Sequence, residues 1–295
     1  MAVADLSSRK PLAQVLAQAR AARRAVGHFN VSDLVLLKGV LAGANELNVP
    51  VIVGASEGER EFLGTKQLAA LVRSLRDACP FPVYLNADHT HSLPKALEAA
   101  RAGFDSVVFD LSELPLEENI RRTKEAVEAL KAVNPDFIVE GEIGNIGSGS
   151  EIHQAAVTEY QFTTPAEATE FVRATGIDVL APAVGNFHGM LRQMLDGSQD
   201  KRLNIDVIRA IATASGIPLT LHGGSRTDEG DLVKAVEAGI TIVHINTELR
   251  LAWRQSLAEA LASHPDEVVP YKLLRGPVDA VARIVRAKLE LLCRA

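Results

Sequence analysis

The stretch Val83–His89, which reads VYLNADH, is the clearest indication of the fold. It is a short apolar run that ends in an acid and a histidine. Two further apolar runs also end in a histidine: residues 179–188 read VLAPAVGNFH, and residues 217–222 read IPLTLH. If the three runs are parallel strands of one barrel, their carboxyl ends meet at one mouth, and the three imidazoles converge there.

Eight such runs lie along the chain, each rich in apolar residues at nearly every position. This pattern is typical of strands buried on both faces, as in a parallel sheet. Segments with a 3.6-residue period separate the runs, for example 34–47 and 117–133. The expected strands are 26–31, 50–55, 81–87, 105–110, 137–142, 178–184, 217–221 and 240–245.

The alternation predicts an α/β protein, a single (β/α)8 TIM-barrel domain over residues 1–295. An extra N-terminal helix is expected at about 11–24, and a C-terminal helical extension at about 249–262 and 277–292. The alternative is a doubly wound open sheet, which usually needs fewer strands, and no GxGxxG loop follows the first strand. The connection 143–164 lacks a helical pattern, and connections this long are often functional.

Composition narrows the partners and the location. The 295 residues are 47% hydrophobic, enough for a large core, and the net charge is -6 at pH 7. No long Lys/Arg block is present, which argues against nucleic acid and anionic membrane as partners. The two cysteines suggest no disulfide framework, and neither a signal-peptide pattern nor an apolar run of about 20 residues is seen. We therefore expect a cytoplasmic protein.

His89, His188 and His222 are the candidate metal ligands. A lone histidine is more often structural, but three at the ends of the third, sixth and seventh strands offer three neutral nitrogens to one cation. Such a set with an open position is typical of a catalytic divalent-metal site, usually Zn²⁺. Glu142 shares a face with Glu140 at the end of the fifth strand, and is a fourth candidate ligand. Asp110, at the end of the fourth strand, has a similar position.

Further polar residues at the strand ends suggest proton transfer and anion binding. Asp88 is placed for general acid/base work, although a helix cap or an orienting contact to a metal-bound histidine is the alternative. After the seventh strand, Gly223-Gly224-Ser225 lets backbone N–H groups approach a phosphate. Asn246 is a candidate for substrate hydroxyls and Thr247 for a helix cap. His244 stays open between core, substrate contact and support of the metal ligands.

These residues together resemble the class II, metal-dependent ketose-bisphosphate aldolases, which include fructose- and tagatose-bisphosphate aldolases. The similarity covers nearly the whole chain, from Ala25 to Lys288. The motifs that carry it are GHFN (27–30), ADH (87–89), GFDSVVFD (103–110) with EN (118–119), VEGEIG (139–144), GNFHG (185–189) and LHGGS (221–225).

The resemblance implies a barrel enzyme that is a homodimer or homotetramer, with zinc on the three histidines and Asp88 as the proton-transferring group. A monovalent cation often accompanies the phosphate site in this family. Asn30 and Ser56 match positions near the substrate. The residues implied to contact the phosphate of dihydroxyacetone phosphate are Gly189, Gly223, Gly224, Ser225 and Thr247.

The expected reaction is the reversible cleavage of a ketose (bis)phosphate, first of all fructose 1,6-bisphosphate, to dihydroxyacetone phosphate and glyceraldehyde 3-phosphate. Asp88 takes the proton of the C4 hydroxyl, and a Lewis-acidic metal stabilises the enediolate that remains. Holding the phosphate fixes the carbon skeleton in position. No Schiff-base lysine is needed.

Several positions depart from the family pattern. Asn86 stands where the family commonly has a histidine, and HINT (244–247) replaces Asn-x-Asp-Thr. SGSE (148–151) replaces the mobile-loop motif, so that Glu151 is a shifted substitute for the loop acid. His28 and Arg226 are also unusual. These changes suggest that the aldehyde half or the phosphorylation pattern differs from fructose 1,6-bisphosphate.

Three alternatives remain at this level. One is a tagatose-bisphosphate or other ketose-phosphate aldolase that uses a different aldehyde. Another is a metal-dependent hydrolase, suggested by His89-Thr90-His91, although such pairs usually lie on the first strand. The last is a non-catalytic family member, suggested by the altered eighth strand and loop.

Overall fold

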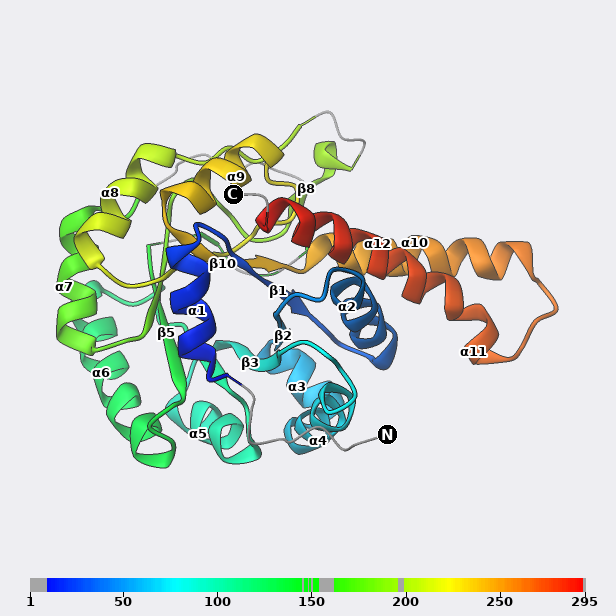
Figure 1. The fold of residues 1–295 in the computed structure, drawn as a ribbon, viewed down its shortest axis with the longest axis horizontal. Coiled ribbons are helices and arrows are strands. Elements are labelled where there is room, and N and C mark those ends of the chain that lie inside the picture. Colours follow the sequence, from blue (N-terminus) through cyan, green and yellow to red (C-terminus); the bar gives the residue numbers. More distant parts are fainter. Residues whose placement is uncertain are drawn as a thin grey trace.

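The eight predicted strands close into one parallel barrel, and the (β/α)8 prediction is confirmed. The computed structural model describes residues 10–144, 146–147, 149, 151–153, 162–195 and 199–293. Around the barrel the strand order is β1-β10-β9-β7-β5-β4-β3-β2 (Figure 1). The barrel strands are β1 (Val26–Asn30), β2 (Val51–Ala55), β3 (Val83–Thr90), β4 (Ser106–Phe109), β5 (Ile138–Ile143), β7 (Val179–Pro182), β9 (Leu219–Leu221) and β10 (Ile240–Ile245).

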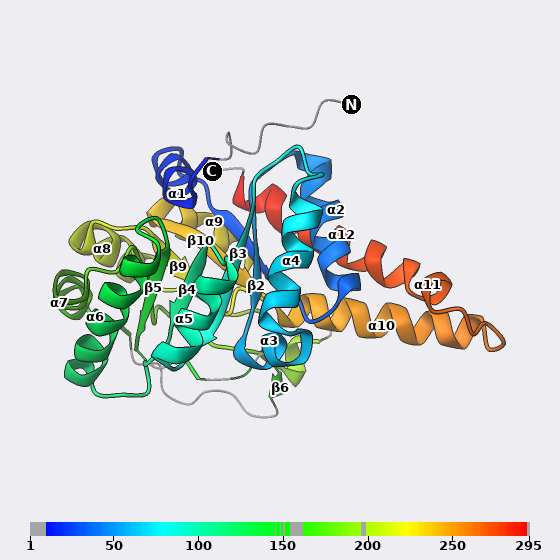
Figure 2. The same cartoon turned by 90° about the horizontal axis from the view of Figure 1, so that it is seen from below.

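Helices cover the outer face of the barrel, close its amino-terminal end and form a projecting arm (Figures 1 and 2). They are α1 (Leu12–Ala21), α2 (Leu34–Leu47), α3 (Glu57–Leu63), α4 (Thr65–Arg76), α5 (Leu93–Ala102), α6 (Leu116–Val133), α7 (Pro165–Thr175), α8 (Ile205–Ser215), α9 (Glu229–Ala238), α10 (Thr247–Ser263), α11 (Pro270–Leu273) and α12 (Arg275–Leu292). A short pair of strands, β6 (Ile152–His153) and β8 (Met190–Leu191), and a 3-10 turn (Arg192–Met194) lie in the long connections. Among the described helices, none has the length and apolar character that a membrane crossing requires.

Alternation along each strand separates a helix-facing surface from the barrel interior. Phe29, Leu85 and Val243 belong to the large apolar core, which includes residues of the surrounding helices. The residues between them point inward, and their character changes along the barrel axis. The amino-terminal layer is apolar, whereas the next layers are polar and include the His28, Asn86, Glu140 and His244 side chains.

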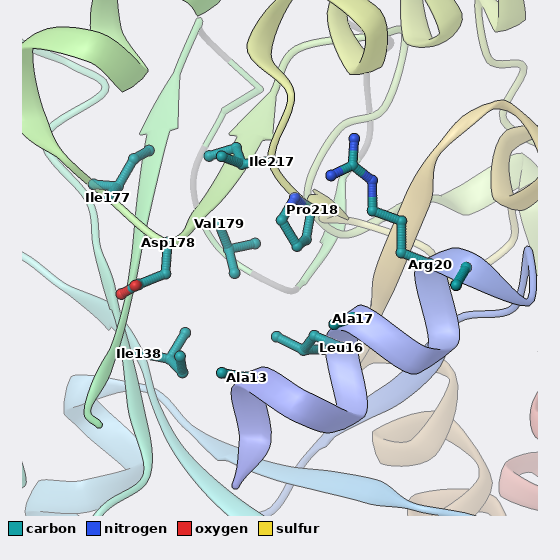
Figure 3. A pocket seen from close by; sticks show the side chains of 11 residues that line it. Ala13, Leu16, Ala17, Arg20, Ile138, Ile177, Asp178, Val179, Ile217 and Pro218 are labelled. Atoms are coloured by element: carbon teal, nitrogen blue, oxygen red, sulfur yellow. The ribbon is translucent and has the colours of Figure 1, made fainter. Parts of the chain in front are cut away.

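The extra N-terminal helix closes the amino-terminal end of the barrel. Leu12, Val15 and Leu16 of α1 pack against the apolar inner layer, which includes Ile52 and Tyr84. A largely apolar pocket of about 730 Å³ remains between α1 and the starts of β5, β7 and β9 (Figure 3). Because active sites of this fold lie at the carboxyl ends of the strands, this pocket is at the wrong end to be the catalytic site.

Strand β3 is longer than the sequence pattern predicts. It was expected to end at residue 87, but it continues to Thr90, and its register with β4 shifts between Ala87 and Thr90. His89 lies inside this irregularity with a φ of +29°, a value that L-residues rarely adopt. A β-bulge breaks the strict alternation of side chains, so that Asp88 and His89, although adjacent, both face the barrel mouth.

The C-terminal extension forms an arm. Helices α10 and α12 run side by side and project beyond the barrel, with α11 at the tip (Figures 1 and 2). At its base, α12 packs against α2, and it contacts α10 along the arm. The sequence pattern anticipated this extension but named no helices for residues 56–80, where Gly64 separates α3 from α4 with a φ of +83°.

Candidate active site

The three predicted metal ligands meet at the carboxyl end of the barrel. Ligand atoms of His89, His188 and His222 all lie within 4.8 Å of one another. His89 Nε2 and His222 Nδ1 are 3.1 Å apart, and the ring centroids of His188 and His222 are 5.6 Å apart. Residues separated by up to 133 positions in the sequence thus form one cluster.

Each of the three imidazoles uses its outer nitrogen to donate a hydrogen bond. His89 Nδ1 donates to Asp110 Oδ2 at 2.8 Å, His188 Nδ1 to the carbonyl of Gly147 at 2.7 Å, and His222 Nε2 to Glu140 Oε1 at 2.6 Å. A carbonyl or carboxylate oxygen only accepts, so these nitrogens carry the protons. The inner nitrogens of His188 and His222 therefore carry lone pairs, and that of His89 carries one whenever its ring is neutral.

This arrangement fits a divalent cation. His188 Nε2 is buried without a hydrogen-bond partner. Three converging imidazole lone pairs, each fixed by an acceptor on the far side of its ring, are what protein zinc sites use. The histidines would hold the ion, and Asp110, Gly147 and Glu140 would orient them.

The buried charges around the cluster shift the protonation of its members. Burial alone favours neutral His89, but Asp88, Asp110 and Glu142 overcome it and raise the pKa of His89 to about 10. Burial and the charge on His89 lower the pKa of His188 and of His222 to about 3. Without a metal, one proton is therefore stored at His89, and a cation would replace it.

Glu142 is the fourth predicted ligand, and it lies beside the cluster. Its Oε2 is 3.4 Å from His222 Nδ1 and 3.8 Å from His89 Nδ1, and it is buried without a hydrogen-bond partner. Burial, with the charge of Asp110, raises the pKa of Glu142 well above its ordinary value. A cation bound nearby would favour the ionised carboxylate of Glu142.

Asp88 is held at the wall of the same cluster. Asn30 Nδ2 donates to Asp88 Oδ2 at 2.8 Å and to Glu59 Oε2 at 2.9 Å. Asp88 Oδ1 faces His244 Nδ1 at 3.3 Å. Burial disfavours a charged Asp88, but His89 and His244 outweigh this and hold the pKa of Asp88 well below its ordinary value. The group is therefore a carboxylate at neutral pH, able to accept a proton.

A column of imidazoles forms the floor of the site. The ring of His28 stacks on that of His244 at 3.5 Å, and His244 stacks on His222 at 4.2 Å. His28 also contacts Asn86 Oδ1 at 3.1 Å. A Cβ on Gly54 would lie 2.1 Å from the His28 ring, so only glycine at this position leaves room for the column.

One wall of the site consists of glycine-containing loops and a helix N-terminus, which are features that favour anion binding. The cleft between the histidines and this wall is lined by Asn30, Asp88, His89, His188, Gly189, Gly223, Ser225, His244, Asn246 and Thr247. Thr247 is the first residue of the 17-residue helix α10, so that the helix N-terminus faces this cleft. Helix N-termini and glycine-rich backbone favour phosphate.

The sequence matches a known protein family over nearly its whole length. The model described as "Fructose-bisphosphate aldolase class-II" matches residues 10–295. The chain belongs to this family. It is therefore a class II aldolase, an enzyme that makes and breaks a carbon–carbon bond, as the sequence motifs predicted.

Relatives of this aldolase carry more than one substrate name. A 6-phospho-5-dehydro-2-deoxy-D-gluconate aldolase of Shouchella clausii is 33% identical, covering 95% of this chain and 93% of its own. A fructose-bisphosphate aldolase of Geobacillus stearothermophilus is also 33% identical, covering 94% of each chain. The solved structure of the YdjI aldolase of Escherichia coli K12 has a TM-score of 0.80 and 30% identity, covering 95% of this chain and 96% of that one.

Two predicted substrate-binding residues of the aldolase, Ser56 and Gly224, and the predicted loop acid, Glu151, have other contacts in this structure. Ser56 caps α3, with its Oγ donating to Glu59 Oε2 at 3.0 Å. Gly224 donates its N–H to the carbonyl of His244 at 2.9 Å. Glu151 is exposed, and its carbonyl accepts from the Met190 N–H at 2.9 Å. Their roles toward substrate stay predictions. Ser148 and Ser150, which precede Glu151 in the altered loop motif, lie outside the described residues.

The histidine that suggested a hydrolase lies outside the metal cluster. His91 has a 59% exposed side chain, and its Nδ1 contacts the Asp110 carbonyl at 3.0 Å. Its ring therefore does not join His89 in holding an ion. The HxH pattern here consists of one candidate ligand and one surface residue.

The sequence pattern missed Arg60, which supports the aldolase site. Arg60 is buried, and its guanidinium donates to the carbonyls of Ala55 at 2.5 Å and Asp88 at 3.1 Å. It also donates to Thr90 Oγ1 at 2.9 Å, so it spans the bulge of β3. An arginine at a helix position gives no local sign of such a role, because its partners come from two neighbouring strands.

Proposed function

We propose that this family member cleaves a ketose bisphosphate, with fructose 1,6-bisphosphate as the first candidate, to dihydroxyacetone phosphate and glyceraldehyde 3-phosphate. The observation that carries the proposal is the convergence of three imidazole lone pairs within reach of a buried, ionised Asp88. His89, His188 and His222 would hold Zn²⁺ or another divalent metal, with Glu142 beside it. The metal would supply a Lewis acid for the negative charge of the enediolate.

Asp88 is the proton-transferring group in this proposal. In the cleavage direction its carboxylate takes the proton of the C4 hydroxyl. The C4–O bond becomes the aldehyde carbonyl, and the electron pair of the C3–C4 bond stays on the three-carbon fragment. Asn30 orients the carboxylate through the 2.8 Å hydrogen bond to Oδ2, which leaves Oδ1 facing the cleft and His244.

The glycine-containing loops and the start of α10 that line the cleft would hold the substrate by its phosphate. Gly189, Gly223, Ser225 and Thr247 line the cleft beside the histidines. Binding at this distance from the reacting carbons orients the skeleton without taking part in the chemistry. Glu151, on the connection after β5, is our candidate for the acid that exchanges the proton of the three-carbon fragment.

A different aldehyde half is the second candidate, and the imidazole column favours it. His244 lines the cleft, and its Nδ1 lies 3.3 Å from Asp88 Oδ1, so that its ring is placed to contact a polar substrate group beside the carboxylate. One relative is named for a phosphorylated sugar acid and another for fructose bisphosphate. Both are 33% identical to this chain, so sequence identity does not discriminate between the two substrates.

A substrate panel tests both versions. The enzyme is incubated with dihydroxyacetone phosphate and one aldehyde at a time, and condensation is followed by the disappearance of dihydroxyacetone phosphate and of the aldehyde. Condensation with glyceraldehyde 3-phosphate supports the first version. Condensation with another aldehyde alone supports the second. No condensation with any aldehyde, in protein that carries its metal, would show a non-catalytic member.

We further propose a homodimer or homotetramer located in the cytoplasm. The projecting arm supports the assembly, because Leu261, Val268 and Tyr271 are exposed at its outer part. Exposed apolar groups gathered on a projecting element are typical of contact surfaces. Both cysteines, Cys79 and Cys293, are free thiols, consistent with a reducing compartment.

A further inference from the structure

A buried lysine ties together the two loops that carry metal ligands. Lys201 is 2% exposed. Its Nζ donates to the carbonyls of Phe187 at 2.8 Å, Gly189 at 2.6 Å and Gly223 at 2.8 Å. An ammonium has three N–H donors and no acceptor, so all of its hydrogen-bonding capacity is used. Phe187 and Gly189 flank His188, and Gly223 follows His222.

The three carbonyls converge because the two loops touch. Gly189 and Gly223 adopt φ values of +74° and +63°, and a Cβ on Gly223 would lie 2.1 Å from the Phe187 carbonyl. Carbonyl oxygens that point at one spot repel each other unless a positive charge lies between them. The ring of Phe187, whose centroid is 4.5 Å from Nζ, adds a further surface that attracts a cation.

The charge of Lys201 is not paired within the described part of the chain. Glu248 is the carboxylate that acts on it electrostatically, but Glu248 itself pairs with Lys288 at 3.1 Å. Burial lowers the pKa of Lys201 to about 7, whereas the three carbonyl acceptors favour the ammonium. The same glycines that contact Nζ line the cleft, so an anion bound there would lie close to this buried charge.

This arrangement does not fit a free monovalent cation between these loops. Such an ion would need the oxygen atoms to which Nζ already donates. We propose that the Lys201 ammonium is a built-in cation that positions the phosphate-binding loops, so that phosphate binding needs no added K⁺ or Na⁺. The proposal rests on the proposed function, since it assigns the phosphate to this cleft. Lys201 acts here as a positioning residue.

Calorimetric binding of dihydroxyacetone phosphate to the zinc-loaded enzyme tests the proposal and requires no turnover. Wild-type affinity should change less than about twofold between buffers that contain K⁺, Na⁺ or only tetramethylammonium. Lys201→Ala should bind about 10- to 100-fold more weakly, because a charged hydrogen-bond donor is lost. Added K⁺ or NH₄⁺, which fit the vacated space, should restore binding, whereas tetramethylammonium should not.

Two further variants separate positioning from simple packing. Lys201→Met fills the same space without charge, so its weak binding should not be rescued by any cation. Lys38→Ala, on the exposed side of α2, should bind as the wild type does. A wild-type enzyme that needs K⁺ or Na⁺ would overturn the proposal, as would equal affinities of all variants. Failure of aldol cleavage alone, with this binding pattern intact, would instead count against the proposed function.

Discussion

At the scale of single residues, Asp88 is the group on which turnover depends. Asp88→Asn keeps the shape and the contact to Asn30 but cannot accept a proton. We expect kcat to fall by about 10²–10⁴-fold with the metal content unchanged, as is usual for loss of a general acid/base. Asp206→Asn, on an exposed aspartate of α8, is the matched control. A fully active Asp88→Asn enzyme would show that another group moves the proton.

Glu140 should act on the metal through His222. Its Oε1 accepts from His222 Nε2 at 2.6 Å, and its Oε2 accepts from Thr220 Oγ1 at 2.7 Å. Glu140→Gln should weaken zinc binding by about 10- to 100-fold, measured by competition with a chromophoric chelator. Glu128→Gln, on the exposed face of α6, should leave it unchanged. If both variants bound zinc with equal affinity, Glu140 would have no role in stabilising the metal site.

Metal binding should release about one proton at neutral pH. The pKa of His89 is raised to about 10 in the metal-free protein, so this ring is protonated below that pH, whereas His188 and His222, with pKa values of about 3, are already neutral. Zinc binding must displace the single proton on His89, and affinity should therefore rise as pH rises toward 10. Calorimetry of zinc binding in buffers of different ionisation enthalpy measures the number of protons released. Release of no proton would contradict this prediction.

Sequence reasoning could find residues whose role follows from their position on a strand. His89, His188 and His222 lie at or beyond the carboxyl ends of buried strands, and the fold brings those ends together. The role of His244 could not be decided, because it depends on stacking with His28, which a missing side chain at Gly54 makes possible. The partners of Lys201 lie 14 residues before it and 22 after it, and no local pattern marks such contacts.

At the scale of elements, the close packing of β1 against β2 leaves room for the stacked rings of His28 and His244 beneath the site. Gly54→Ala would place a methyl group 2.1 Å from the His28 ring. We expect a loss of about 1–3 kcal/mol in the free energy of unfolding, typical of overpacking. Gly58→Ala in α3 meets nothing within 4 Å and should be neutral or stabilising, because alanine favours helix. Urea unfolding measures both; equal stabilities would contradict the steric account.

Strand and helix positions were largely predictable, because burial on both faces leaves a continuous apolar run. The end of β3 was not. The bulge between Ala87 and Thr90 is supported by Arg60, whose guanidinium donates to the Asp88 carbonyl and to Thr90, and neither contact is visible from spacing. Bulges often re-aim side chains at functional sites, as this one does for Asp88 and His89.

At the scale of the whole molecule, the arm should mediate assembly. Light scattering coupled to gel filtration should give a mass of two or four chains. Replacing both Val268 and Tyr271 by Glu should reduce that mass, because these side chains are 84% and 64% exposed in one chain. Phe62→Glu, at a 79% exposed position on α3, is the control. A monomeric wild type would contradict the assembly, and dissociation by Phe62→Glu alone would place the interface elsewhere.

The central claim is that one divalent cation, held by imidazoles from three strand ends, is required for carbon–carbon cleavage. The most direct measurement is a zinc titration of the chelator-stripped enzyme, with cleavage of the active substrate as the readout. The account predicts no activity in the stripped enzyme and a linear rise that ends at one zinc per chain, with no recovery in His222→Ala. Full activity of the stripped enzyme in the presence of chelator would contradict it.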